Sequence, residues 1–159
     1  MGYQSGVRWR IGLGVVLALL VAGWLGLAFT TSAGTDAHAF RNAAAKTAQG
    51  ALSAVRTARL AGQARLDGRM FDTTLSPVLD NAVRGVATAE EELAATPAPG
   101  PAQAPIRDQL TRLLDEASRT VGDLVAAFDR SEDPAARSAV AALGPLGDRL
   151  ADFVEEHRP

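Results

Sequence analysis

Residues 106–128 read IRDQLTRLLDEASRTVGDLVAAF, and their apolar residues recur at spacings of four and three. This spacing places them on one face of an α-helix, and in a folded protein that face is covered by other elements. The face consists of Ile106, Leu110, Leu113, Ala117, Val121, Leu124 and Phe128. Leu114 falls at the edge of the face, so we expect it to be less buried than Leu113.

The segment 35–66 has the same periodicity but uses small side chains. Small residues let the backbone of a neighbouring helix approach closely. Asp67-Gly68, which follows the segment, predicts a turn. The row of small residues comprises Ala44, Ala48, Ala51, Val55, Ala58 and Gly62.

Two more helices are predicted, over 76–95 and from Asp133 onward. In the helix over 76–95, Ser76 is a candidate cap and Pro77 suits the first helical position, where no amide donor is needed. Asp133-Pro134 repeats this pattern, and we expect Gly144-Pro145 to kink or break the last helix. The helix over 76–95 has its apolar face at Leu75, Leu79, Ala82, Val86, Ala89 and Leu93.

The clearest interruption between predicted helices is the segment 96–105, which contains four prolines and one glycine. A regular helix does not cross such a segment, so it is a linker between the second and third helices. Four amphipathic helices joined by short connections predict an all-α fold, an antiparallel four-helix bundle. The bundle is expected to occupy 31–159.

Composition supports helices and excludes several classes of protein. The chain has 32 alanines, 5% aromatic residues and no cysteine, so neither disulfides nor thiolate metal ligands contribute. Its net charge of −2 gives no strongly basic domain, and we expect no nucleic-acid partner.

The charges are unevenly distributed along the chain. Residues 41–69 contain six cationic side chains and one acid, whereas 97–159 contain seven arginines and eleven acids. This asymmetry indicates a basic helix packed beside an acidic one; the alternative is a basic face for an anionic lipid or cell-wall polymer. Three pairs at i,i+4 are expected to add local stability: Asp80 with Arg84, Asp108 with Arg112, and Asp115 with Arg119.

Residues 11–29 carry no charge and would span roughly 28 Å as a helix, close to the thickness of a bilayer core. We therefore predict a transmembrane helix over 11–30 that acts as a signal anchor. Arg8 and Arg10 precede it, which predicts a short cytoplasmic N-terminus over 1–10 and an extracytoplasmic C-terminal domain. The alternative is a cleaved signal peptide, because Ala37-His38-Ala39 fits a cleavage site.

Four small residues in this segment follow one another at i+4 and form a nearly straight stripe: Gly14, Ala18, Ala22 and Gly26. Helices in a bilayer associate by close packing, which small residues permit. The stripe predicts that the membrane helix pairs with a second copy of itself, giving a homodimer; another membrane helix is the alternative.

Residues that could carry chemistry are few. His38 and His157 would lie at the same end of a bundle, with Asp36, Asp152, Glu155 and Glu156 as further metal ligands. Neither histidine belongs to a HExxH or ExxH pair, so we expect both to be exposed to solvent, with no metal bound. The run 90–92 of three glutamates is interpreted as a solvated helix face. No nucleophile motif or cofactor motif is present, so we expect no cofactor and no enzymatic activity.

The predicted function is therefore non-enzymatic. We expect a membrane-anchored extracytoplasmic helical bundle that binds an unknown partner protein or is an accessory subunit of a membrane complex. The alternative is an extracytoplasmic ligand-sensing four-helix bundle that signals through a partner. In broad layout the chain is similar to the sensor domains of bacterial chemoreceptors, but it has no second membrane segment, and we do not assign it to that family.

Overall fold

Helices account for the ordered structure throughout the described part of the chain. The structure is a computed structural model that describes the backbone of residues 6–158 and the side chains of residues 36–158. Over residues 6–158 it contains four helices and no strand, which confirms the all-α prediction. The helices are α1 (Gly6–Leu66), α2 (Asp72–Ala95), α3 (Ala104–Asp129) and α4 (Asp133–Glu156).

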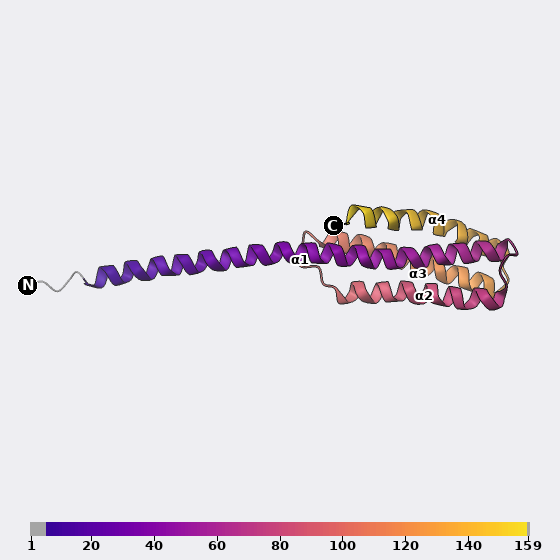
Figure 1. The fold of residues 1–159 in the computed structure, drawn as a ribbon, viewed down its shortest axis with the longest axis horizontal. Helices are drawn as coiled ribbons and strands as arrows, with labels where there is room; N and C mark the ends of the chain where they lie inside the picture. Colours follow the sequence, from indigo (N-terminus) through magenta and orange to yellow (C-terminus); the bar gives the residue numbers. More distant parts are fainter. Residues whose placement is uncertain (1–5, 159) are drawn as a thin grey trace, which may run out of the picture. The chain divides into compact units, whose positions relative to one another are not determined.

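The chain divides into two compact units, Met1–Asp36 and Ala37–Pro159. In the second unit, α2, α3, α4 and the part of α1 from Ala37 pack together, and consecutive helices run in opposite directions (Figure 1). This arrangement is that of a four-helix bundle.

The bundle is held together by one apolar core to which every helix contributes. The part of α1 in the second unit supplies mainly alanines, whereas α2, α3 and α4 supply most of the leucines. Alanine on one side and leucine on the other allow the helices to interdigitate at close range, as in other close-packed interiors. The largest fully buried side chains are Phe153, Leu110, Leu114, Leu124, Leu143, Leu146, Leu150, Val55, Val86 and Val121.

The prediction that Leu114 is less buried than Leu113 is wrong. Leu114 is 1% exposed and Leu113 is 7% exposed, so the residue at the edge of the stripe is the more buried one. The reason is that α3 packs against α2 on one side and α4 on the other. A helix with neighbours on both sides buries a wider face than a single stripe.

The turn predicted at Asp67-Gly68 is present and ends α1. Gly68 adopts a φ of +69°, in the left-handed region that glycine occupies at little cost. The amide of Arg69 donates to the carbonyl of Ala64 at 2.8 Å, and the amide of Gly68 donates to the carbonyl of Arg65 at 3.0 Å. These two bonds form a Schellman motif, which satisfies carbonyl groups that the end of the helix leaves unpaired.

The prediction that Ser76 caps the second helix is wrong, because α2 begins one turn earlier, at Asp72. The amides of Thr74 and Leu75 already donate to the carbonyl of Phe71, each at 3.0 Å. Asp72 supplies negative charge to the first turn, where the helix dipole favours it. Pro77 consequently lies inside the helix on its exposed side.

The last helix also differs from expectation. It continues from Asp133 to Glu156 through Pro145 without a break. Pro145 removes the amide that would bond to Ala141, but both residues are exposed, so water can reach that carbonyl. At the start of α4, the cap position is Glu132 instead of Asp133, which lies in the first turn.

Several sequence predictions fall on residues 1–35, whose side chains lie outside the described residues. They are the cytoplasmic segment 1–10, the membrane helix over 11–30 and the stripe of Gly14, Ala18, Ala22 and Gly26. Among the residues that the structure describes, no helix has both the length and the apolar character required to span a membrane.

Two glycines of α1 allow a direct test of the close packing in the bundle. A Cβ at Gly62 would lie 2.8 Å from Cγ2 of Val140 and 3.2 Å from Cδ2 of Leu124, whereas a Cβ at Gly50 would meet nothing within 4 Å. We expect Gly62→Ala to lower the free energy of unfolding by about 1 kcal/mol, because overpacking outweighs the gain in helix propensity. Gly50→Ala should raise it by about 0.5–1 kcal/mol. Urea denaturation measures both; a stabilising Gly62→Ala would show that this contact is loose.

Candidate functional site

The surface between α3 and α4 contains a groove with a volume of about 430 Å³. Leu113 and Phe153 form its apolar floor, and both side chains are buried, at 7% and 1% exposed. Polar and charged side chains complete the lining: Gln109, Arg112, Glu116, Arg149, Asp152 and Glu156. We refer to this site as the α3–α4 groove.

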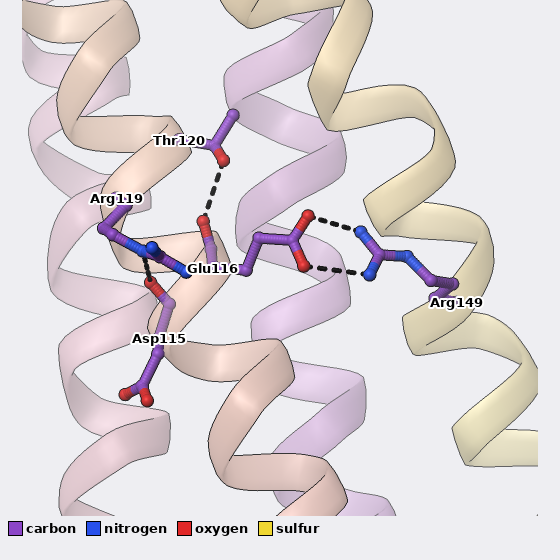
Figure 2. A network of polar contacts seen from close by, with 5 residues as sticks. All are labelled: Asp115, Glu116, Arg119, Thr120 and Arg149. Atoms are coloured by element: carbon purple, nitrogen blue, oxygen red, sulfur yellow. Dashed lines mark hydrogen bonds and ion pairs between the residues drawn. The ribbon is translucent and has the colours of Figure 1, made fainter.

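An ion pair between Glu116 of α3 and Arg149 of α4 crosses the groove (Figure 2). Nη1 of Arg149 donates to Oε2 of Glu116 at 2.9 Å, and Nη2 donates to Oε1 at 2.5 Å. Two parallel bonds fix the relative orientation of guanidinium and carboxylate, which a single bond does not. The pair therefore links α3 to α4 across the groove.

The neighbouring polar groups of α3 are bonded within their own helix. The hydroxyl of Thr120 donates to the carbonyl of Glu116 at 2.8 Å, and Nε of Arg119 donates to the carbonyl of Asp115 at 3.2 Å (Figure 2). The i,i+4 spacing predicted an ion pair between Arg119 and the Asp115 carboxylate, but Arg119 bonds to the Asp115 backbone instead.

The other two predicted i,i+4 ion pairs are also absent from residues 36–158. Arg84 donates to the amide oxygen of Asn81 at 2.6 Å instead of to Asp80. Arg112 has no ion-pair contact with Asp108 and lines the α3–α4 groove instead. Spacing along a helix identifies charges that can meet, but exposed pairs of this kind are worth only a few tenths of a kcal/mol and are readily replaced.

The ion pair shifts the pKa of both its members. The hydrogen bonds from Arg149 lower the pKa of Glu116 below its ordinary value of 4.5, although partial burial acts in the opposite direction. The hydrogen bonds to Glu116 raise the pKa of Arg149 above its ordinary value. The carboxylate is therefore charged at neutral pH, and the pair persists well into the acid range.

This pair predicts a specific dependence of stability on pH. Because the pKa of Glu116 is lower in the folded state than in the unfolded state, its contribution is complete above pH 4.5 and is lost as the pH falls through the folded value. Glu116→Gln should therefore lower the free energy of unfolding at pH 7, by less than about 1 kcal/mol for so exposed a pair. The difference from the wild-type chain should vanish in strong acid. Chemical denaturation of both proteins from pH 7 to pH 2 tests this; a difference that grows in acid would contradict it.

A second groove, with a volume of about 280 Å³, lies between α1 and α4. Leu66, Val140 and Ala141 form its apolar part. Its polar lining contains two cationic side chains, Arg59 and Arg137, and the remaining lining residues are Gln63 and Asp67. We refer to this site as the α1–α4 groove.

A third groove lies between α2 and α3 and has a volume of about 340 Å³. Arg107, at its edge, donates to the carbonyl of Thr96 at 3.3 Å and so fastens the start of the proline-rich segment to α3. Between the two helices only residues 96–103 are outside regular helix, so Ala104 and Pro105 of the predicted linker belong to α3.

The two histidines lie in different environments. His38 is exposed, as predicted, and its Nδ1 is 3.5 Å from Nη2 of Arg41. His157 is only 8% exposed, so the prediction of an exposed side chain is wrong for this residue. Its ring stacks on Phe153 with the centroids 4.2 Å apart, and Nδ1 is 2.8 Å from the Phe153 carbonyl oxygen. A carbonyl only accepts, so Nδ1 carries the proton and donates.

The glutamates at 90–92 also differ from one another. Glu91 and Glu92 are exposed, as a solvated helix face predicts, whereas Glu90 is half-buried and lines the groove between α2 and α3. Glu92 accepts a hydrogen bond at 3.1 Å from the hydroxyl of Thr47, which is 5% exposed. Glu92 thus joins α2 to α1. Within residues 36–158, no group of three or more His, Asp or Glu side chains is arranged to hold a metal ion.

Comparison with known proteins adds no assignment to this geometry. No family model matches the chain, and neither a curated protein nor a solved structure matches it.

Proposed function

We propose that the chain is a non-enzymatic, membrane-anchored extracytoplasmic helical bundle that binds a partner protein, as an accessory subunit of a membrane complex. The observation that carries this proposal is the composition of the α3–α4 groove. It places two arginines, Arg112 and Arg149, and further polar side chains over a buried apolar floor of Leu113 and Phe153. Arginine is among the residue types that contribute most to binding energy in protein interfaces.

The rigidity of the groove also favours binding. Glu116 and Arg149 are held by two mutual hydrogen bonds, and Phe153 is 1% exposed within the core. Side chains that are already fixed lose little conformational entropy when a partner binds. Arg112 and Gln109 on the rim remain available for polar contacts with that partner.

The membrane anchor rests on the amino-acid sequence. The uncharged run 11–29 is long enough for a bilayer, and Arg8 and Arg10 precede it. In this proposal, residues 11–30 anchor the chain and residues 31–159 lie outside the cytoplasm. The stripe of Gly14, Ala18, Ala22 and Gly26 then brings two copies together in the membrane.

Site-specific photo-crosslinking in native membranes tests the partner proposal. A photo-reactive amino acid replaces Gln109, which lines the α3–α4 groove, or Arg84, which is exposed on α2 and lines no described groove. The Gln109 position should give one discrete adduct with a protein identified by mass spectrometry, and Arg112→Glu should abolish that adduct. Equal, diffuse labelling from Gln109 and Arg84 would contradict the proposal.

The α3–α4 groove also supports the second candidate, a ligand-sensing bundle. Its volume of about 430 Å³ lies within the range of small-molecule sites. However, its lining is mainly charged, whereas such sites are mostly apolar, so we favour the partner protein. A small ligand that survives purification of the full chain in detergent and is lost in Arg112→Glu would reverse this preference.

A further inference from the structure

We propose that the α1–α4 groove is an anion site that accepts the carboxylate side chains of an acidic segment of the partner protein. This inference rests on the proposed partner-binding function and names the chemistry of a second contact. It begins with Arg59, an exposed residue of α1 that lines the groove.

The guanidinium of Arg59 lies close to Gly144 of the facing helix α4. A Cβ at Gly144 of α4 would lie 3.4 Å from Cζ of Arg59 and 3.7 Å from Nε and Nη1. The guanidinium therefore occupies the space beside Gly144 into which a larger side chain at that position would extend.

The charge of Arg59 is not compensated by a bonded carboxylate. Within residues 36–158, no acceptor lies within hydrogen-bonding distance of its guanidinium and no acid lies within 4.0 Å of it. Arg137, the second cation of the groove, has only Asp133 as an ion-pair partner, at 4.0 Å between exposed groups. Both guanidinium groups keep donors that a ligand can use.

The one carboxylate that lines the groove is already occupied. Asp67 accepts hydrogen bonds from Arg69 and from Nε2 of Gln63, and these bonds lower the pKa of Asp67 below its usual value. It therefore stays charged, but its charge is balanced by Arg69, which does not line the groove. Arg59 therefore contributes a positive charge without a bonded carboxylate, and Arg137 adds a second guanidinium that is paired with Asp133 only at 4.0 Å.

These features select the class of ligand. Guanidinium groups match carboxylates because their donors form a planar fork. The apolar part formed by Leu66, Val140 and Ala141 suits the methylene groups of glutamate or aspartate side chains. A volume of about 280 Å³ accommodates one or two such side chains, whereas the two cations would repel a basic segment.

Binding of a dye-labelled hexaglutamate peptide to the full chain in detergent micelles tests the inference. Fluorescence anisotropy at low salt measures the dissociation constant, and hexalysine is the peptide of opposite charge. We expect the wild-type chain to bind hexaglutamate and not hexalysine. The double variant Arg59→Gln, Arg137→Gln should bind hexaglutamate at least about tenfold more weakly, since charge-assisted hydrogen bonds are lost.

The matched control is the double variant Arg84→Gln, Arg119→Gln, which removes the same charge from exposed positions of α2 and α3 outside the described grooves. It should bind within about twofold of the wild-type chain, and circular dichroism should show equal melting temperatures for all three proteins. Equal weakening in both double variants would assign the binding to net charge and overturn the inference. Absence of hexaglutamate binding by the wild-type chain would also overturn it.

The two proposals fail in distinguishable ways. The photo-crosslinking experiment reports partner capture through Gln109 in the α3–α4 groove, which shares no lining residue with the α1–α4 groove. If hexaglutamate does not bind but the Gln109 adduct forms, the anion site is rejected and the partner function stands. If the adduct is also missing, the partner function is rejected as well.

Discussion

Leu114→Asp is expected to lower the free energy of unfolding by about 4 kcal/mol, which would leave the bundle close to unfolded at room temperature. Leu114 is 1% exposed and belongs to the apolar core, so an aspartate there would be a charge without a partner or access to water. Thermal and urea denaturation followed by circular dichroism measure the loss.

Two further variants separate burial from the chemistry of the substitution. Ser118→Asp places the same charge one turn further along α3, at an exposed position, and should change stability by less than about 0.5 kcal/mol. Leu113→Asp should be severe but no worse than Leu114→Asp, because Leu113 is 7% exposed at the edge of the α3–α4 groove. A Leu114→Asp protein more stable than Leu113→Asp would show that α3 is buried on one side alone.

Phe153→Ala is expected to destabilise the bundle by about 3–5 kcal/mol. Phe153 is 1% exposed, contributes to the α3–α4 groove and supports the ring of His157. Its removal leaves a cavity in the core and takes away the surface on which His157 packs. The free energy of unfolding from urea titration gives the magnitude.

Phe71 provides the matched control for this change. It is 82% exposed at the start of α2, so Phe71→Ala should change stability by less than about 0.5 kcal/mol. Comparable losses from the two substitutions would contradict the assignment of Phe153 to the core.

The helices could be predicted from the sequence because periodicity and turn residues are local signals. The apolar face of 76–95 predicts the buried face of α2, and Asp67-Gly68 predicts the end of α1. Local signals do not predict the burial of a side chain when that burial depends on a neighbouring helix. Leu114 is buried because α2 covers the flank of α3 that a single-helix pattern assigns to the edge.

The prolines show a related limit. Ser76-Pro77 and Gly144-Pro145 resemble a helix start and a helix break, yet both prolines lie on exposed sides of continuous helices. There, water can replace the missing backbone bond, and the packing of the opposite face holds the helix together.

The candidate site was less predictable than the fold. Glu116 and Arg149 are 33 residues apart, so no short-range spacing identifies them as a pair. Arg59 is one of six cations in a basic stretch, and only the packing of α1 beside α4 shows that it shares a groove with Arg137. His157 is buried because Phe153 precedes it by one turn, which the apolar pattern of α4 could have indicated.

Cysteine accessibility in intact cells tests the proposed topology most directly, because the chain has no cysteine of its own. Ser118→Cys introduces a thiol at an exposed position of α3, and Ser5→Cys introduces one before the uncharged run. For a retained anchor with the bundle outside the cytoplasm, a membrane-impermeant maleimide should label Ser118→Cys in intact cells. It should label Ser5→Cys only after permeabilisation, on a protein of full length. Labelling of Ser118→Cys only after permeabilisation, or a mature protein that no longer contains position 5, would contradict a membrane-anchored extracytoplasmic bundle.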